Sequence, residues 1–97
     1  MNKKISEIGD RAKSIFKLLV ENYVATGEPL GSKSISSKIN NQLSPATIRS
    51  VLNEINLYGL IKKDHFSAGS IPTDFGLHFY TQAILEPGTL KKKEKKL

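Results

Sequence analysis

The sequence has no cysteine and no tryptophan, and its apolar residues never form a long run. Without cysteine the chain can form neither a disulfide framework nor a thiolate metal site, which fits a reducing compartment. No run approaches the ~18 apolar residues of a membrane span. The basic start MNKKISEIGD also lacks the apolar stretch of a secretory signal. We therefore expect a soluble, cytoplasmic protein with no membrane partner.

Catalytic and metal-binding patterns are equally scarce. The only histidines are His65 and His78, and no carboxylate cluster lies at ligand spacing from either. Residues 27–34 superficially resemble a phosphate-binding loop, but the glycines are one residue too close together and a helix, not a strand, is expected before them. No nucleophile elbow or paired-carboxylate motif occurs. The sequence predicts a protein that is not an enzyme and has no cofactor, metal or evident small-molecule substrate.

The positive charge is unevenly distributed. The net charge is +6, but residues 91–97 contribute +4 and Lys3 with Lys4 contribute +2, so residues 5–90 sum to zero. Within them, residues 31–65 hold five basic and two acidic groups, a surplus of +3. A local basic surplus is typical of a nucleic-acid contact. The terminal lysines either attract nucleic acid non-specifically or reflect an AT-rich coding bias.

The first predicted helix covers residues 10–25. Asp10 is placed to cap its start, and Gly27 is placed to end it in the left-handed conformation. Apolar residues at steps of three and four form its expected buried face, namely Ala12, Ile15, Phe16, Leu19, Val20, Tyr23 and Val24.

A short second helix and a longer third one follow. The second is expected at residues 32–39, with Ser32 as its cap, and the turn after it falls at Asn40-Asn41. In the third, Ser44 is the expected cap and Pro45 the first helical residue, and the helix runs to about Tyr58. Its expected buried side is Ile48, Val51, Leu52 and Ile55. The side facing outward is small and polar, and consists of Ala46, Arg49, Ser50 and Asn53.

A hairpin and a last helix complete the predicted order. Residues 60–63 form one candidate strand, and Ile71 pairs back as the second, with Pro72 confining the pairing to an edge. Thr73 is placed to cap a helix that runs to about Leu85. The candidate buried positions of this helix are Phe75, Phe79, Tyr80 and Ile84.

This order predicts a mostly α fold with a small β-hairpin, the winged helix-turn-helix. We expect a basic N-terminal arm at residues 1–9, the winged helix-turn-helix DNA-binding domain at residues 10–86 and a disordered lysine-rich tail at residues 87–97.

Four motifs add a closer resemblance. They are GEPLGSK at residues 27–33, SPATIR at 44–49, GLI at 59–61 and HFSAGSIPTD at 65–74. In this order and spacing they resemble the N-terminal DNA-binding domain of the HrcA-type heat-inducible transcription repressors, which spells them roughly GEPVGSK, SSATIRN, LGYL and HTSAGRIPT. The resemblance covers about residues 10–82 and is specific when the motifs are taken together.

The resemblance implies a function and partners. Proteins of this family repress chaperone operons as dimers on an inverted-repeat operator and lose activity on heat shock. It therefore implies a repressor of heat-shock genes that binds double-stranded DNA as a homodimer. Ser44, Thr47, Arg49 and Ser50 match the recognition-helix motif, and residues 67–73 match the wing.

The chain also departs from the family. Ser70 stands where the family has an arginine suited to phosphates, and Ser50 stands where it has an asparagine that reads adenine. The family continues for a couple of hundred residues into dimerisation and sensing regions. The chain is then either a stand-alone reader or a shortened remnant of a repressor. The alternative function is a degraded or stand-alone winged helix that serves protein interaction or non-specific nucleic-acid binding.

Each candidate contact has a structural alternative. Arg49 either binds a guanine edge or phosphate, or it is a solvated surface arginine or an ion-pair partner of Glu54. Ser44 either binds phosphate or only caps its helix. Lys62 and Lys63 either meet phosphates or are simply solvated. The complete set expected to contact DNA is Ser44, Ala46, Thr47, Arg49, Ser50, Asn53, Lys33, Lys62, Lys63, Ser67 and Ser70.

Overall fold

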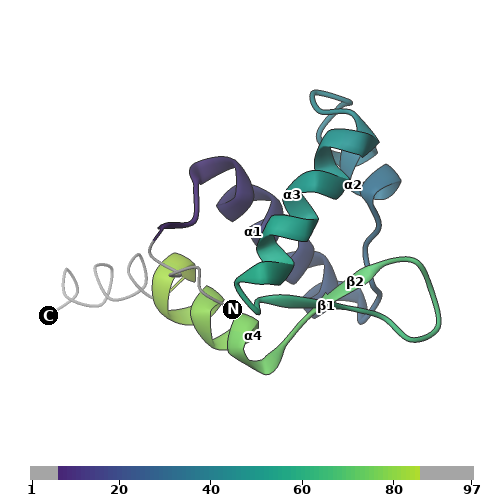
Figure 1. The fold of residues 1–97 in the computed structure, drawn as a ribbon. Coiled ribbons are helices and arrows are strands. Elements are labelled where there is room, and N and C mark those ends of the chain that lie inside the picture. The colour runs from purple at the N-terminus through teal and green to yellow at the C-terminus, as the bar shows by residue number, and fades with distance from the viewer. Residues whose placement is uncertain (1–6, 86–97) are drawn as a thin grey trace, which may run out of the picture.

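The chain folds in the order helix, helix, helix, hairpin, helix in the computed structural model, which describes residues 7–85 (Figure 1). The elements are α1 (Asp10–Thr26), α2 (Ser32–Lys38), α3 (Pro45–Leu57), β1 (Ile61–Lys63), β2 (Ser70–Pro72), α4 (Asp74–Phe79) and the π-helical η2 (Tyr80–Leu85). Nearly all of the expected basic arm, and the whole lysine-rich tail, lie outside the described residues. Ile8, just before α1, is already part of the buried core.

The caps of both early helices lie one residue before the positions predicted for them. The caps of α1 and α2 are Gly9 and Gly31, so the predictions of Asp10 and Ser32 as caps are wrong. In each case the carbonyl of the glycine already accepts the first helical hydrogen bond, at 2.9 Å from the amide of Lys13 and 3.0 Å from that of Ile35. Asp10 instead lies in the first turn, where a carboxylate interacts favourably with the helix dipole.

The predicted helix ends and turns are confirmed. Gly27 ends α1 at φ 75° and donates its N–H to the carbonyl of Tyr23 at 2.7 Å. Asn40 and Asn41 both have positive φ, at 59° and 60°, as asparagines in a tight turn often do. Ser44 caps α3 with Pro45 as its first residue, and Gly59 follows the helix at φ 80°.

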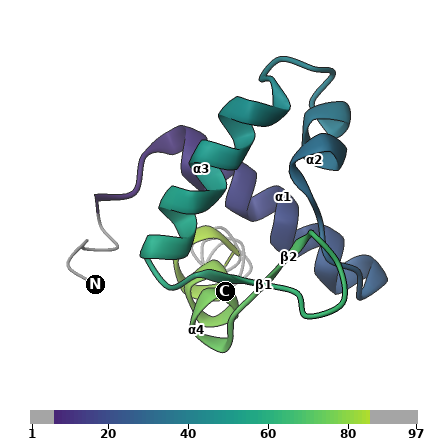
Figure 2. The same ribbon diagram turned by 45° about the vertical axis from the view of Figure 1, so that its right-hand side comes forward.

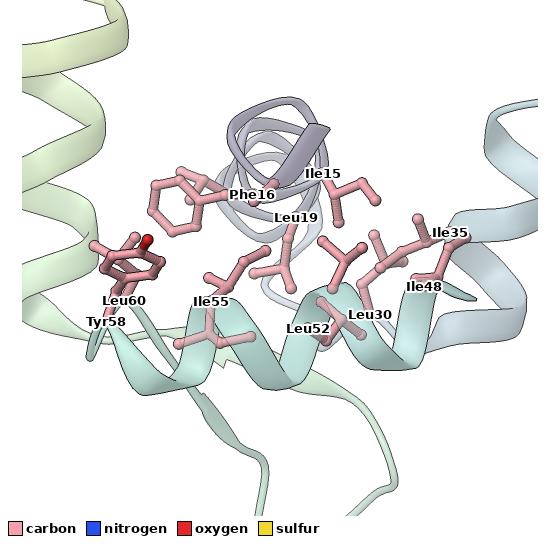
Figure 3. Packing of buried hydrophobic residues seen from close by; sticks show 14 of the residues in the cluster. Ile15, Phe16, Leu19, Leu30, Ile35, Ile48, Leu52, Ile55, Tyr58 and Leu60 are labelled. Carbon is pink, nitrogen blue, oxygen red and sulfur yellow. The ribbon is translucent and has the colours of Figure 1, made fainter. Parts of the chain in front are cut away.

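One apolar core lies between α1, α2, α3 and the start of the hairpin (Figures 2 and 3). Figure 3 shows Phe16 and Leu19 of α1 facing Ile55 of α3. The predicted buried side of α3 is confirmed in full, because Ile48, Val51, Leu52 and Ile55 are all buried. Packing of this apolar stripe, more than helix propensity, holds the short, serine-rich α2 in place through Ile35.

Two positions expected in the core are exposed. Val24 lies in the last turn of α1, past the stretch that other elements cover, and is 71% exposed. Phe75 is 50% exposed because its neighbour Gly76 is the residue of α4 that turns inward. A Cβ on Gly76 would collide with the carbonyl of Leu60, so α4 approaches the hairpin backbone through this glycine.

The hairpin is antiparallel, and it gains a third partner. Ile61 pairs with Pro72 and Lys63 with Ser70, and β1 begins at Ile61, one residue later than expected. On the other side of β2, Ser70 and Leu30 exchange N–H to carbonyl hydrogen bonds at 3.0 Å in both directions. The segment before α2 is therefore tied directly to the wing.

The last helix has the predicted extent but changes geometry within it. Thr73 caps α4 as expected, and its hydroxyl accepts from the N–H of Gly76 at 2.9 Å. From Tyr80 the backbone continues as the π-helix η2. Phe79 packs on Phe16 of α1 with ring centroids 5.9 Å apart, which fixes this end against the core.

This arrangement confirms the predicted fold class, a winged helix-turn-helix. Over residues 7–85, no helix combines the length and apolarity that crossing a membrane requires.

Candidate nucleic-acid interface

A cleft of about 390 Å³ opens where the start of α2, one side of α3 and the hairpin meet. Its cations come from these three elements, Lys33 from α2, Arg49 from α3 and Lys63 from β1. The described residues that line it include no carboxylate. Figure 2 shows α2 and α3 above the hairpin on this side of the molecule. The local basic surplus of the sequence is thus gathered mainly at one concave surface.

The outward side of α3 is exposed, as predicted. Ala46, Arg49, Ser50 and Asn53 all have exposed side chains. Arg49 and Asn53 also line the cleft, whereas Ala46 and Ser50 lie outside its lining. Small residues beside a guanidinium and an amide form a surface that another macromolecule can approach closely.

Arg49 makes no ion pair with Glu54 or with any other carboxylate among residues 7–85. Of the two alternatives for this arginine, the ion pair with Glu54 is therefore not found among the described residues, and a solvated surface arginine remains. Its guanidinium, with a planar set of donors, stays available for an acceptor at the mouth of the cleft.

Ser44 and Thr47 are occupied with each other at the start of α3. The hydroxyl of Ser44 accepts from the N–H of Thr47 at 3.2 Å and donates to the hydroxyl of Thr47 at 3.0 Å. The cap role of Ser44 is therefore present in the structure. Neither residue lines the cleft.

The two lysines of β1 separate. Successive side chains of a strand point to opposite faces, and Lys63 lines the cleft while its exposed neighbour Lys62 does not. Ser67 lies in the β1–β2 loop, where its hydroxyl accepts from the N–H of Gly69 at 3.1 Å. Ser70 is only 5% exposed and lies in the wall of the cleft, next to the segment of Leu30, and not at the tip of the wing.

Three polar residues of the cleft were not predicted from the sequence. Asn56 lies three residues after Asn53 and seven after Arg49, so helical spacing could have identified it. Ser32 and Ser34 flank Lys33 at the start of α2, but whether they line the cleft depends on how α2 packs against the hairpin. No local pattern in the sequence indicates that packing.

A second, larger hollow of about 560 Å³ lies on another part of the surface, against α1. It contains Arg11 and Lys17, but also Glu21 and the apolar side chains of Leu18 and Ile39. Its mixed charge does not favour a polyanion, so the smaller cleft is the better candidate site.

Within residues 7–85, no metal site accompanies the cleft. Tyr80, which is not in its lining, has a pKa raised by burial and by its hydrogen bond to Glu21, where the phenol donates to the carboxylate at 2.8 Å. Among residues 7–85 there is no group of three His, Asp or Glu side chains placed to hold a metal ion.

Comparisons with known proteins agree on one group of relatives, although no family model matches the chain. The chain is 43% identical over 94 residues to the heat-inducible transcription repressor HrcA of Nitrobacter hamburgensis, covering 97% of this chain and 26% of that protein. It is 44% identical over 91 residues to HrcA of Afipia carboxidovorans, covering 94% and 25%. HrcA of Chelativorans sp. is 41% identical over 96 residues, covering 99% and 27%.

A solved structure supports the same relationship. A crystal structure of a hypothetical protein superposes with a TM-score of 0.76 at 32% identity, covering 86% of this chain and 27% of that one. The chain spans about a quarter of the length of the curated relatives it matches. The resemblance inferred from the four motifs is confirmed by these matches.

Proposed function

The chain is homologous to the N-terminal part of the HrcA heat-inducible transcription repressors, and from this premise we propose that it is a DNA-binding module of a transcriptional repressor. The observation that carries the proposal is the cleft in which Lys33, Arg49 and Lys63 converge without a carboxylate. A concave surface of one sign attracts the phosphate backbone of DNA and orients the protein on it.

In the proposed complex α3 lies in the major groove, which is wide enough to admit a helix. Ala46 and Ser50 are small and let the helix approach closely. Arg49 donates to the O6 and N7 acceptors of guanine, and the amide of Asn53 pairs with the edge of adenine. Lys33 and Lys63, from the elements on either side, contact the flanking phosphates, which fix the register but carry no sequence information.

The finer parts of the proposal concern the operator and the assembly. We propose that two copies bind the half-sites of an inverted repeat, because a single module of this size usually binds weakly and a dimer gains affinity from both half-sites. The regulated genes are proposed to be heat-shock or chaperone genes, in line with the name of the relatives.

The chain's two arginines allow a matched experiment. Arg49→Ala removes a cation from the cleft, whereas Arg11→Ala removes one from the hollow against α1. Fluorescence anisotropy with a duplex enriched by the parent chain from a random pool should show affinity falling about tenfold or more for Arg49→Ala. Arg11→Ala should change it little. Equal binding by the parent and Arg49→Ala would contradict the placement of α3.

A second experiment distinguishes the proposed function from non-specific binding through the lysine-rich end. If the chain attracts nucleic acid only through its lysine-rich end, deletion of residues 91–97 abolishes binding and the parent shows no preference between enriched and random duplexes. The proposed function requires the preference to survive the deletion at moderate salt.

A further inference from the structure

The tip of the wing carries the most exposed large apolar side chain among residues 7–85. Phe66, in the loop between β1 and β2, is 95% exposed, and the ring of His65 lies at a centroid distance of 6.4 Å with the two ring planes at 72°. The loop projects away from the helices (Figure 1). An aromatic ring presented in this way makes almost no contribution to the core of the fold.

The loop that presents Phe66 is anchored. The N–H of Phe66 donates to a carboxylate oxygen of Asp64 at 3.0 Å, and the N–H of Asp64 donates to the carbonyl of Gly69 at 3.0 Å. Gly69 in turn packs so closely on Pro29 and Leu30 that a Cβ there would lie 2.9 Å from Pro29 Cβ. Because its base is fixed, the loop loses less conformational freedom when the ring contacts a partner.

The position of this ring identifies the class of partner. Ala68, two residues along the same loop, lines the cationic cleft, and Lys63 lines it from the adjacent strand. A ligand seated on the cleft therefore passes beside the wing tip. The charge of the cleft favours a polyanion, and the polyanion that also offers apolar faces for an aromatic ring is a nucleic acid, through its stacked bases.

We propose that Phe66 inserts into the minor groove of duplex DNA as an apolar wedge, beside the half-site contacted by α3, and partly unstacks one base step. This inference rests on the proposed function and extends it. A phenyl ring has no hydrogen-bond donor or acceptor, so it does not read base edges. It favours steps that open easily, the TA and CA/TG steps, and bends the duplex toward the major groove. The module thereby selects sequence at a position that α3 does not contact.

The test uses the full chain and the enriched duplex with 2-aminopurine placed in turn at each base step that flanks the α3 half-site. Binding of the parent should raise the fluorescence at one step, because the analogue brightens when it is unstacked. Phe66→Ala should abolish this rise and weaken binding about tenfold. Phe66→Leu, which keeps an apolar wedge, should retain most of both effects. Phe75→Ala is the matched control, since Phe75 is also exposed but lies on α4.

The outcomes separate this inference from the proposed function. If Phe66→Ala binds and unstacks like the parent while Arg49→Ala loses affinity, the wedge is refuted and the DNA-binding function stands. If the parent binds no duplex, both fail. Loss of self-association by Phe66→Ala in sedimentation, with DNA binding unchanged, would instead assign the ring to a contact between copies of the chain and overturn the wedge.

Discussion

The cleft and the hollow against α1 each contain one of the chain's two arginines, but the surroundings of the two arginines differ. Arg11 shares the hollow against α1 with Glu21 and apolar side chains, whereas Arg49 shares the cleft with two lysines and several amides and hydroxyls. The hollow against α1 is the larger one. The comparison favours the sign and uniformity of charge, rather than volume, as the criterion for proposing which concave surface of this domain binds a polyanion.

The largest expected effect comes from reversing the charge of one hollow at a time. Lys33→Glu combined with Lys63→Glu should weaken binding to the enriched duplex on the order of 100-fold, because attraction to phosphates becomes repulsion. Arg11→Glu combined with Lys17→Glu changes the net charge equally, and should cost no more than about fivefold through long-range repulsion. Anisotropy at a fixed salt concentration measures both. Equal losses would mean that only total charge matters.

The width of the cleft can be altered without touching a charge. Gly69→Ala places a Cβ against Pro29 and Leu30 and should lower the free energy of unfolding by about 1–3 kcal/mol, as overpacking does. It should also weaken DNA binding, since it separates the hairpin from the segment before α2. Gly9→Ala is the control for DNA binding, because a Cβ there meets nothing within 4 Å and Gly9 does not line the cleft. Urea unfolding and anisotropy of both variants provide the measurement.

The two lysines of β1 test the edge of the cleft. Lys63→Ala should weaken binding several-fold and reduce the slope of log affinity against log salt by about one, as expected for one lost phosphate contact. Lys62→Ala, on the opposite face of the strand, should leave the slope nearly unchanged. Measuring the affinity of both variants over a range of salt concentrations gives the two slopes. Identical slopes would show that the strand does not orient its lysines toward and away from DNA.

The smallest effect is expected beside the hollow against α1. Tyr80→Phe removes the hydrogen bond to Glu21 and should cost less than about 1 kcal/mol of stability, with DNA binding unchanged. The pKa of Tyr80 is raised above its ordinary value of 10.0, first by burial and then by Glu21. The contribution of the bond is therefore present below pH 10 and is lost as the pH rises through the folded-state pKa. Thermal unfolding from pH 8 to pH 11 should show this loss in the parent and not in Tyr80→Phe.

Local chemistry explains what the sequence made predictable. The cap formed by Ser44 and Pro45, the left-handed Gly27 and the apolar stripe of α3 each depend on a few neighbouring residues. The misplaced caps show the limit of this reasoning. Gly9 and Gly31 have no side chain that could signal a cap, so local chemistry points to the polar residue that follows each.

Tertiary packing decides the remainder. The apolar pattern predicts that Val24 and Phe75 are buried. It does not show how far the neighbouring elements extend along α1, nor that α4 packs against the hairpin through Gly76. The composition of the cleft also depends on tertiary packing. Its separate cations were identified in the sequence, whereas the burial of Ser70 and the presence of Ser32 depend on the pairing of β2 with Leu30.

The pairing of Leu30 with Ser70 also has a consequence for how the binding specificity of the cleft can change. Leu30 and Ser70 are joined through main-chain atoms alone, which every residue except proline supplies in full. Under the proposed function, mutations at positions 49 or 53 can therefore change the preferred target sequence, and mutations at positions 33 or 63 the affinity, while this main-chain pairing stays in place. Binding specificity and the spacing of the hairpin from the segment before α2 thus depend on different atoms, the first on side chains and the second on the main chain.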